Sequence, residues 1–245
     1  MTSVSLPISK PDIEPNSIFY GSEIVPAYLF KKFDQNHTHP PQTGNILHIN
    51  TSPKKLVVID IDYKLLPENT KNTLRTQILS ELDKINEEKV IVQTEHGGLH
   101  IYATFKDLIL KNQNRFVAVS KNECYAIDMF FSLPVAQKSN VVFPPSFVRD
   151  NEFSQVLSYS FLRGDHNSVS VPDVNTIVDH LSNVIDIKGV KDLLIELSHE
   201  PRIVEKKERK FPPFATIKLG EALIDGLIGI KISTSLKNQI RMKYL

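Results

Sequence analysis

The sequence has one cysteine, no tryptophan and no long apolar run. The single cysteine and the lack of a long apolar run each exclude a class of protein. Cys124 alone excludes an internal disulfide and any zinc site built from several cysteines. No stretch approaches the length of about 18 apolar residues that a membrane span needs. The N-terminus also lacks the basic and apolar regions of a signal peptide. We therefore expect an intracellular protein of the cytoplasm or nucleus, not secreted and with no membrane partner.

An excess of charge of one sign is missing too. The chain carries 29 Lys and Arg against 28 Asp and Glu, a formal net charge of +1. Such a chain creates no strong overall field, so any contact with nucleic acid must come from a local patch. Its 245 residues, 41% of them hydrophobic, are enough for one large domain or two small ones.

The composition divides the chain into three parts. Residues 1–16 are rich in Ser and Pro without periodicity, which predicts a disordered arm. Residues 17–187 mix strand and helix patterns and predict one α+β domain. Residues 188–245 predict a helical C-terminal segment, with a linker that contains the basic run 206–210.

Short β-branched and apolar runs predict most of the strands. We expect a hairpin from 46–50 and 54–63, and a second from 90–94 and 99–105 around Gly97 and Gly98. Leu74, Ile78 and Leu82 recur at helical spacing and predict a helix within 67–88. Further strands are expected in 116–120, 125–131, 140–146 and 156–164, and a helix in 171–185.

Asp60 and Asp62 stand at the end of the apolar run LVVIDID. Side chains alternate across a strand, so both carboxylates share one face, roughly 7 Å apart. Close carboxylates repel unless water or a cation separates them, and oxygen ligands suit Mg²⁺ or Mn²⁺. The pattern therefore indicates either a divalent metal site or a strand end that runs out into solvent.

Two further polar residues interrupt apolar strands. His100 follows Gly97 and Gly98 and lies on the polar face of its strand, where it could donate to a phosphate oxygen or serve as a structural histidine. Asp128 is an acid within YAIDMFF, and an unpaired charge there would be costly to bury. Polar residues that break an apolar pattern in three strands are typical of a functional site.

These residues, in this order, resemble the archaeo-eukaryotic primase superfamily, in its primase-polymerase branch of plasmids, viruses and mobile elements. The run VVIDID is similar to the first motif of that family, Gly98-Leu99-His100 to the second, and Ile127-Asp128 to the third. TGNILHIN, VVFPPS, YSFLRG and VPDV also have the expected look, so the resemblance covers about residues 40–175.

The resemblance implies an α+β primase core, in which an RRM-like sheet packs against a smaller N-terminal αβ unit, followed by the helical segment. It implies an enzyme that makes primers on single-stranded DNA from NTPs or dNTPs. Asp60, Asp62 and Asp128 would ligate two Mg²⁺ or Mn²⁺ ions, about 4 Å apart as in other two-metal sites. The residues expected around the triphosphate are His100, Gly98, Gly97, Thr94, Ser146 and Lys138.

The partners follow from the same resemblance: a single-stranded DNA template, nucleoside triphosphates and a replicative helicase in cis or in trans. Template-binding residues are harder to place, and the cations considered are Lys31, Lys32, Lys54, Lys55 and Arg163. Two other functions remain open. One is an inactive primase-fold module that binds DNA at initiation, and the other is a metal-dependent glycosyltransferase that uses Asp60 and Asp62.

Overall fold

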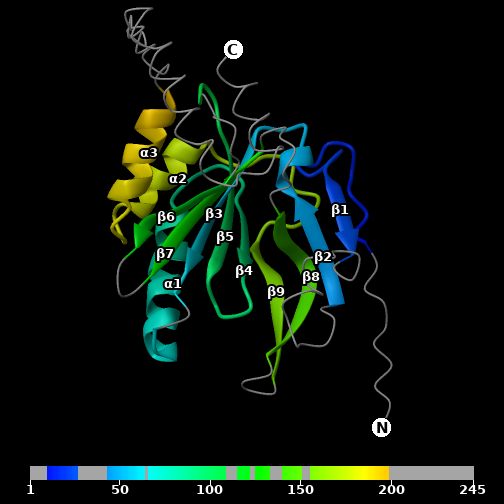
Figure 1. The fold of residues 1–245 in the computed structure, drawn as a ribbon, viewed down its shortest axis with the longest axis horizontal. Helices are drawn as coiled ribbons and strands as arrows, with labels where there is room; N and C mark the ends of the chain where they lie inside the picture. Colours follow the sequence, from blue (N-terminus) through cyan, green and yellow to red (C-terminus); the bar gives the residue numbers. More distant parts are fainter. Residues whose placement is uncertain are drawn as a thin grey trace, which may run out of the picture. The chain divides into compact units, whose positions relative to one another are not determined.

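The computed structural model describes residues 10–26, 43–63, 66–108, 115–121, 125–132, 140–150 and 155–198. These residues form an α+β body with a curled antiparallel sheet and a few helices (Figure 1). Lys31, Lys32, Cys124, Lys138 and residues 201–245 lie outside the described residues, so the expectations for them stay predictions.

The described strands join in one sheet, in the order β1-β2-β8-β9-β4-β5-β3-β7-β6. Every pair of neighbours is antiparallel. The strands are β1 (Glu23–Pro26), β2 (Thr43–His48), β3 (Leu56–Asp62), β4 (Val90–Gln93), β5 (Leu99–Thr104), β6 (Arg115–Lys121), β7 (Ala126–Phe131), β8 (Asn140–Asp150) and β9 (Gln155–Arg163).

One predicted hairpin is confirmed and the other is wrong. The strands β4 and β5 pair across the 94–98 turn, as expected. The strand β2 does not pair with β3. It pairs instead with β1 and with β8, which lies far along the chain. The short 3-10 turn η2 (Ile49–Thr51) and Pro53 carry the chain from β2 to the other half of the sheet.

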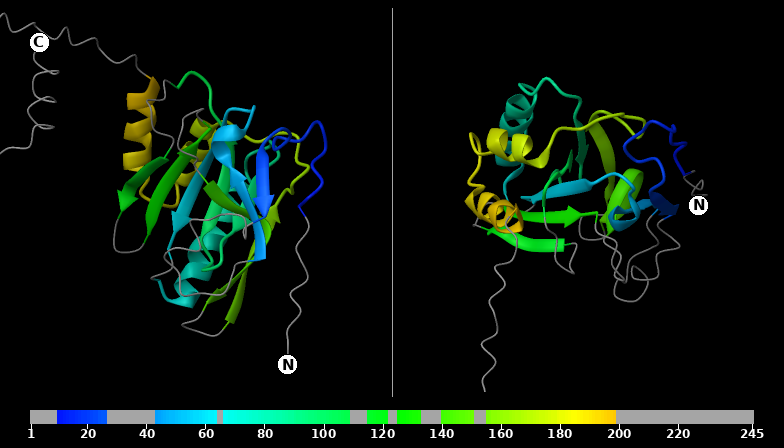
Figure 2. Two further views of the ribbon diagram at one scale, coloured as in Figure 1. Left: turned by 45° about the vertical axis from the view of Figure 1, so that its right-hand side comes forward. Right: turned by 90° about the horizontal axis from the view of Figure 1, so that it is seen from above.

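The helices of the described part cover one side of the sheet (Figure 2). They are α1 (Glu68–Leu82), α2 (Val174–Leu181) and α3 (Lys188–Ser198). Side chains of β3 alternate between the two faces of the sheet, and they contribute to a separate hydrophobic core on each face. Val57, Ile59 and Ile61 pack with the helices, whereas Leu56 and Val58 pack with side chains of β1, β2, β8 and β9.

The described part of the N-terminal segment already contacts the body before Ser17. The backbone N–H of Glu14 donates to Asn167 Oδ1 at 2.8 Å, and Ile13 packs against the second core. Residues 10–16, which we expected within a disordered arm, therefore contact the body. Residues 1–9 lie outside the described part.

At the other end, α3 shares a core with the sheet. Ile187, Val190 and Leu194 are buried in the same cluster as Val57. The compact unit that contains the sheet accordingly extends to Glu200. The boundary that we expected after residue 187 therefore falls inside this packed region.

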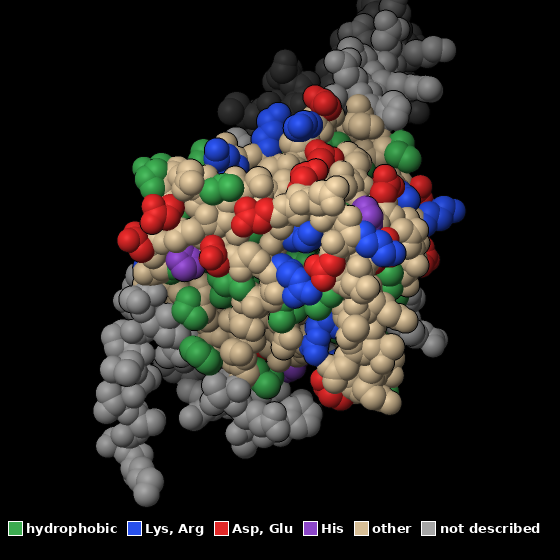
Figure 3. Space-filling view, turned by 180° about the vertical axis from the view of Figure 1, so that it is seen from behind, with side chains coloured by type: hydrophobic (Ala, Val, Ile, Leu, Met, Phe, Trp, Pro, Cys, Tyr) green, Lys and Arg blue, Asp and Glu red, His purple; other side chains and the backbone are tan. Residues whose placement is uncertain are grey.

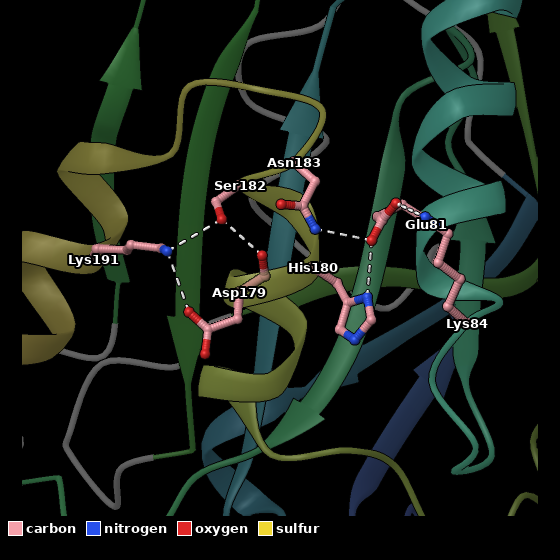
Figure 4. A network of polar contacts seen from close by, with 7 residues as sticks. All are labelled: Glu81, Lys84, Asp179, His180, Ser182, Asn183 and Lys191. Atoms are coloured by element: carbon pink, nitrogen blue, oxygen red, sulfur yellow. Dashed lines mark hydrogen bonds and ion pairs between the residues drawn. The ribbon is translucent and has the colours of Figure 1, made fainter.

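Polar side chains also join α1 to α2 (Figure 4). The carboxylate of Glu81 accepts hydrogen bonds from Lys84 and from Asn183, the latter at 2.9 Å, and lies 3.1 Å from His180 Nδ1. Glu81 is 7% exposed, so these partners replace the water that its charge would otherwise hold. They hold the pKa of Glu81 down at about 2.

Within the described ranges, no helix has the length and apolar character to cross a membrane.

Candidate active site

Three residues from three neighbouring strands form one row across the sheet. Asp60 of β3 stands directly opposite Asp128 of β7 and directly opposite His100 of β5. Directly opposed residues point to the same face, with Cβ atoms about 5 Å apart. The two acids and the histidine that the sequence analysis singled out are therefore brought together.

Asp62 extends this row toward the end of β3. It lies two residues beyond Asp60, opposite Ala126 of β7, and so points to the same face. Asp62 is exposed, whereas the side chains of Asp60 and Asp128 are partly exposed. The three carboxylates thus lie at one end of the sheet, on the face opposite to the helices, where solvent reaches each of them.

His100 is the buried member of the row. It is 5% exposed, and its Nε2 atom lies 3.6 Å from Asp60 Oδ1. Burial lowers its pKa to about 4, and Glu95 opposes this shift only in part. The imidazole is therefore neutral near pH 7, and a neutral ring can donate one hydrogen bond and accept another. Within the described part, its Nδ1 atom has no hydrogen-bond partner.

The turn between β4 and β5 lies beside the end of β3 that carries Asp60 and Asp62. The Gly97 N–H donates to the Thr94 carbonyl at 3.0 Å, and the Thr94 N–H donates to the Gly98 carbonyl at 2.9 Å. Gly97 has φ +83°, a conformation that glycine adopts without strain. A Cβ on Gly98 would lie 2.6 Å from the Ile61 carbonyl and 2.9 Å from Thr94 Oγ1. This turn therefore packs directly against the strand that carries Asp60 and Asp62.

The structure adds two residues that the sequence analysis missed, Tyr159 of β9 and Glu95 of the same turn. The ring centroids of Tyr159 and His100 are 5.9 Å apart. Burial raises the pKa of the Tyr159 phenol, and so does its contact with the Glu95 carboxylate. Tyr159 stands opposite Ser146 across β8 and β9, strands that come late in the chain. No local pattern indicates this neighbourhood, because it arises from the pairing of β9 with β4, the strand next to β5.

Ser146, expected near the triphosphate, has a structural role in this arrangement. It is 2% exposed, and its Oγ accepts from the Asn45 N–H at 2.8 Å and donates to the Phe143 carbonyl at 2.6 Å. The bond from Asn45 ties β2 to β8, and the bond to Phe143 lies within β8. We therefore leave Ser146 out of the site, and Lys138 lies outside the described residues.

The carboxylates suit a hard divalent cation in kind and in register. Oxygen donors on adjacent strands are the ligands that Mg²⁺ and Mn²⁺ prefer. As the side chains stand, the described residues contain no group of three or more His, Cys, Asp or Glu arranged to hold a metal. Side-chain rotation would be needed to converge Asp60, Asp62 and Asp128, and cross-strand spacing of about 5 Å permits it.

Of the cations considered for the template, those that the structure describes, Lys54, Lys55 and Arg163, show no common patch. Arg163 forms a two-point ion pair with Asp83, at 3.0 and 2.7 Å. Lys54 and Lys55 are exposed at the start of β3, at the opposite end of that strand from Asp62. On the face drawn in Figure 3, acidic and basic side chains are interspersed.

A pocket of about 530 Å³ lies beside α2 and α3, away from Asp60, Asp62 and Asp128. Its walls include apolar Leu194 and Ile195 and the ion pair of Lys191 with Asp179, at 3.2 Å. The helices place it on the other side of the sheet from Asp60.

No model of a known protein family matches the chain, and no curated protein matches it either. The described body is an α+β fold with a curled antiparallel sheet, and the row of Asp128, Asp60 and His100 is its candidate site.

Proposed function

We propose that this protein is a primase-polymerase, a nucleotidyltransferase that makes primers on single-stranded DNA. The observation that carries the proposal is the register of Asp128, Asp60 and His100 across β7, β3 and β5. The resemblance to the archaeo-eukaryotic primase superfamily rests on the same residues in the same chain order.

The chemistry of nucleotidyl transfer explains why acids dominate such a site. The attacking 3′-hydroxyl and the leaving pyrophosphate both carry developing negative charge, and the protein mainly positions them and stabilises that charge. Asp60, Asp62 and Asp128 would hold two divalent ions, which supply charge neutralisation and a lowered pKa of the hydroxyl when bound.

The residues of the chain have separate tasks in this proposal. His100, neutral and buried, donates one hydrogen bond to the incoming triphosphate and adds no charge of its own. Tyr159 packs beside the imidazole and keeps water from it. Gly97 and Gly98 let the backbone of the 94–98 turn approach the ligand closely.

A primer-synthesis assay tests the proposal. The full chain is incubated with single-stranded template, Mg²⁺ or Mn²⁺, and labelled rNTPs or dNTPs. We expect labelled products that disappear in Asp60→Asn and in Asp128→Asn. The control is Asp83→Asn, which should leave them unchanged, because Asp83 directly follows α1 and pairs with Arg163 of β9.

Each other outcome favours a different function. Template binding without incorporation in the wild-type chain would favour the inactive initiation module. Hydrolysis or transfer of a nucleotide sugar that depends on Asp60 and Asp62 but not on Asp128 would favour the glycosyltransferase. Incorporation that survives in both Asp60→Asn and Asp128→Asn would show that these carboxylates do not take part in catalysis.

A further inference from the structure

Arg75 of α1 differs from the cations around it. Lys71 pairs with Glu68 at 3.6 Å, Lys84 with Glu81, and Arg163 with Asp83 at 2.7 Å. Arg75 is half-buried, and its guanidinium donates to the side-chain oxygen of Asn72. No carboxylate of the described residues lies within ion-pair distance of it, 4.0 Å or less.

The Arg75 guanidinium lies against the 94–98 turn, beside the end of β3 that carries Asp62. A Cβ on Gly97 would come within 3.3 Å of Arg75 Nη1. A Cβ on the next residue, Gly98, would lie 3.6 Å from the Asp62 Cα. Two consecutive glycines therefore connect the guanidinium to the end of β3 that carries the site.

A second polar group nearby lacks a partner. Tyr63 follows Asp62 directly and is 1% exposed, and within the described part its hydroxyl has no hydrogen-bond partner. Tyr63 belongs to the core that packs with α1, and the charge of Arg75 acts on its phenol. The hydroxyl therefore lies within electrostatic reach of the guanidinium.

A guanidinium that no carboxylate engages can donate to the oxygens of an anionic ligand. The planar guanidinium presents a fork of donors that matches a phosphate group. We propose that Arg75, assisted by the Tyr63 hydroxyl, is a phosphate-binding site at the end of the sheet. The proposal rests on the proposed function in one respect, that the phosphate belongs to a nucleotide or a nucleic-acid strand.

The position limits how the phosphate arrives. The helix α1 covers the face of the sheet opposite to Asp60, so a ligand at the carboxylates reaches Arg75 only around the end of β3. Either the triphosphate tail or a phosphodiester of the template or primer can follow this path. Both have the same chemistry at Arg75, and the cation would offset the repulsion between phosphate and the nearby carboxylates.

Calorimetry on the full chain tests the site with two probes, inorganic tripolyphosphate and a short oligothymidylate. We expect Arg75→Gln to weaken at least one probe about tenfold, the loss typical of a charge-assisted hydrogen bond. Arg75→Lys should restore binding in part, since an ammonium keeps the charge but not the fork. Arg163→Gln is the matched control and should change neither probe, and thermal melting checks that each variant folds.

The two arms separate the sources of the phosphate. Loss of tripolyphosphate binding assigns Arg75 to the triphosphate tail, and loss of oligothymidylate binding alone assigns it to the strand. Unchanged affinity for both probes in Arg75→Gln, or no binding of either by the wild-type chain, overturns the site. If the wild-type chain makes no primers but Arg75→Gln loses phosphate binding, the Arg75 site stands and the polymerase function is rejected. If the wild-type chain makes primers but Arg75→Gln binds phosphate with unaltered affinity, the polymerase function stands and the Arg75 site is rejected.

Discussion

Asp60 and Asp128 face each other across two paired strands, and this arrangement has a cost for the folded chain. Like charges directly opposite in a sheet are destabilising, by about 0.2–1 kcal/mol. Residues that serve a site often carry such a cost, because binding of the ligand relieves it.

Neutralising one of the two acids should therefore separate stability from activity. We expect Asp60→Asn to abolish incorporation and to raise the melting temperature of the metal-free protein by about 1–3 °C. Mg²⁺ should stabilise the wild-type chain and not the variant, because the variant lacks one of the three carboxylates proposed to bind the ion. Thermal melting with and without Mg²⁺ measures both effects. A fall of several degrees on mutation would instead give Asp60 a structural role.

Gly98 is required by close packing. A Cβ there would lie 2.6 Å from the Ile61 carbonyl, and this backbone atom cannot move without shifting β3. We expect Gly98→Ala to lower the free energy of unfolding by about 1–3 kcal/mol and to reduce activity, because the strand that carries Asp60 moves. Urea unfolding measures the loss, with the exposed Ser160→Ala as control. An unchanged free energy of unfolding would show that the turn adapts.

At the scale of elements, the contact between α1 and α2 depends on an ionised carboxylate. The pKa of Glu81 in the folded protein is about 2, below its ordinary value of 4.5. The hydrogen bonds of Glu81 therefore stabilise the fold fully above pH 4.5, and this contribution is lost as the pH falls toward 2.

Glu81→Gln tests this dependence. We expect the variant to be less stable than the wild type at pH 7, and the difference between the two to shrink as the pH is lowered from about 5 to 2. Urea unfolding at a series of pH values gives the result. A difference that stays constant with pH would mean that hydrogen bonding, and not the charge of Glu81, joins the helices.

Local patterns predicted the elements better than their partners. The helix within 67–88, the β4–β5 hairpin and the strands that carry Asp60, His100 and Asp128 are confirmed, because periodicity and turn residues are local signals. The predicted hairpin of 46–50 with 54–63 is wrong, since β2 finds its partner in β8. Pairing of distant strands leaves no local trace in a sequence.

The same limit applies to the site. That Asp60 and Asp62 share a face follows from strand alternation, so the sequence was sufficient for it. The position of Asp128 opposite Asp60 was expected only from the order of three short motifs. Tyr159 and Arg75 could not be found in this way, because β9 comes near His100 by pairing with β4, and Arg75 comes near Gly97 through the packing of α1.

At the scale of the whole described body, α3 belongs to the core that the central strands build. Leu194 is 4% exposed within the cluster that contains Val57, whereas its neighbour Ile195 is 57% exposed. The adjacent positions make a matched pair, with similar side chains and different burial.

We expect Leu194→Ala to lower the free energy of unfolding by about 2–5 kcal/mol, and Ile195→Ala to change it by less than about 1 kcal/mol. Fluorescence and circular dichroism should report one common transition for the helices and the sheet in the Leu194 variant. Melting of α3 ahead of the sheet would support the boundary after residue 187 that the composition indicated.

The pairing of β2 with β8 also has a consequence during synthesis. The Asn45 N–H and its acceptor Ser146 Oγ are 101 residues apart in the chain. The strand β2 therefore leaves the ribosome long before β8 exists, and the edge that pairs with β8 stays unpaired until then. Slow folding and a need for chaperones early in translation are the expected result of so much non-local pairing.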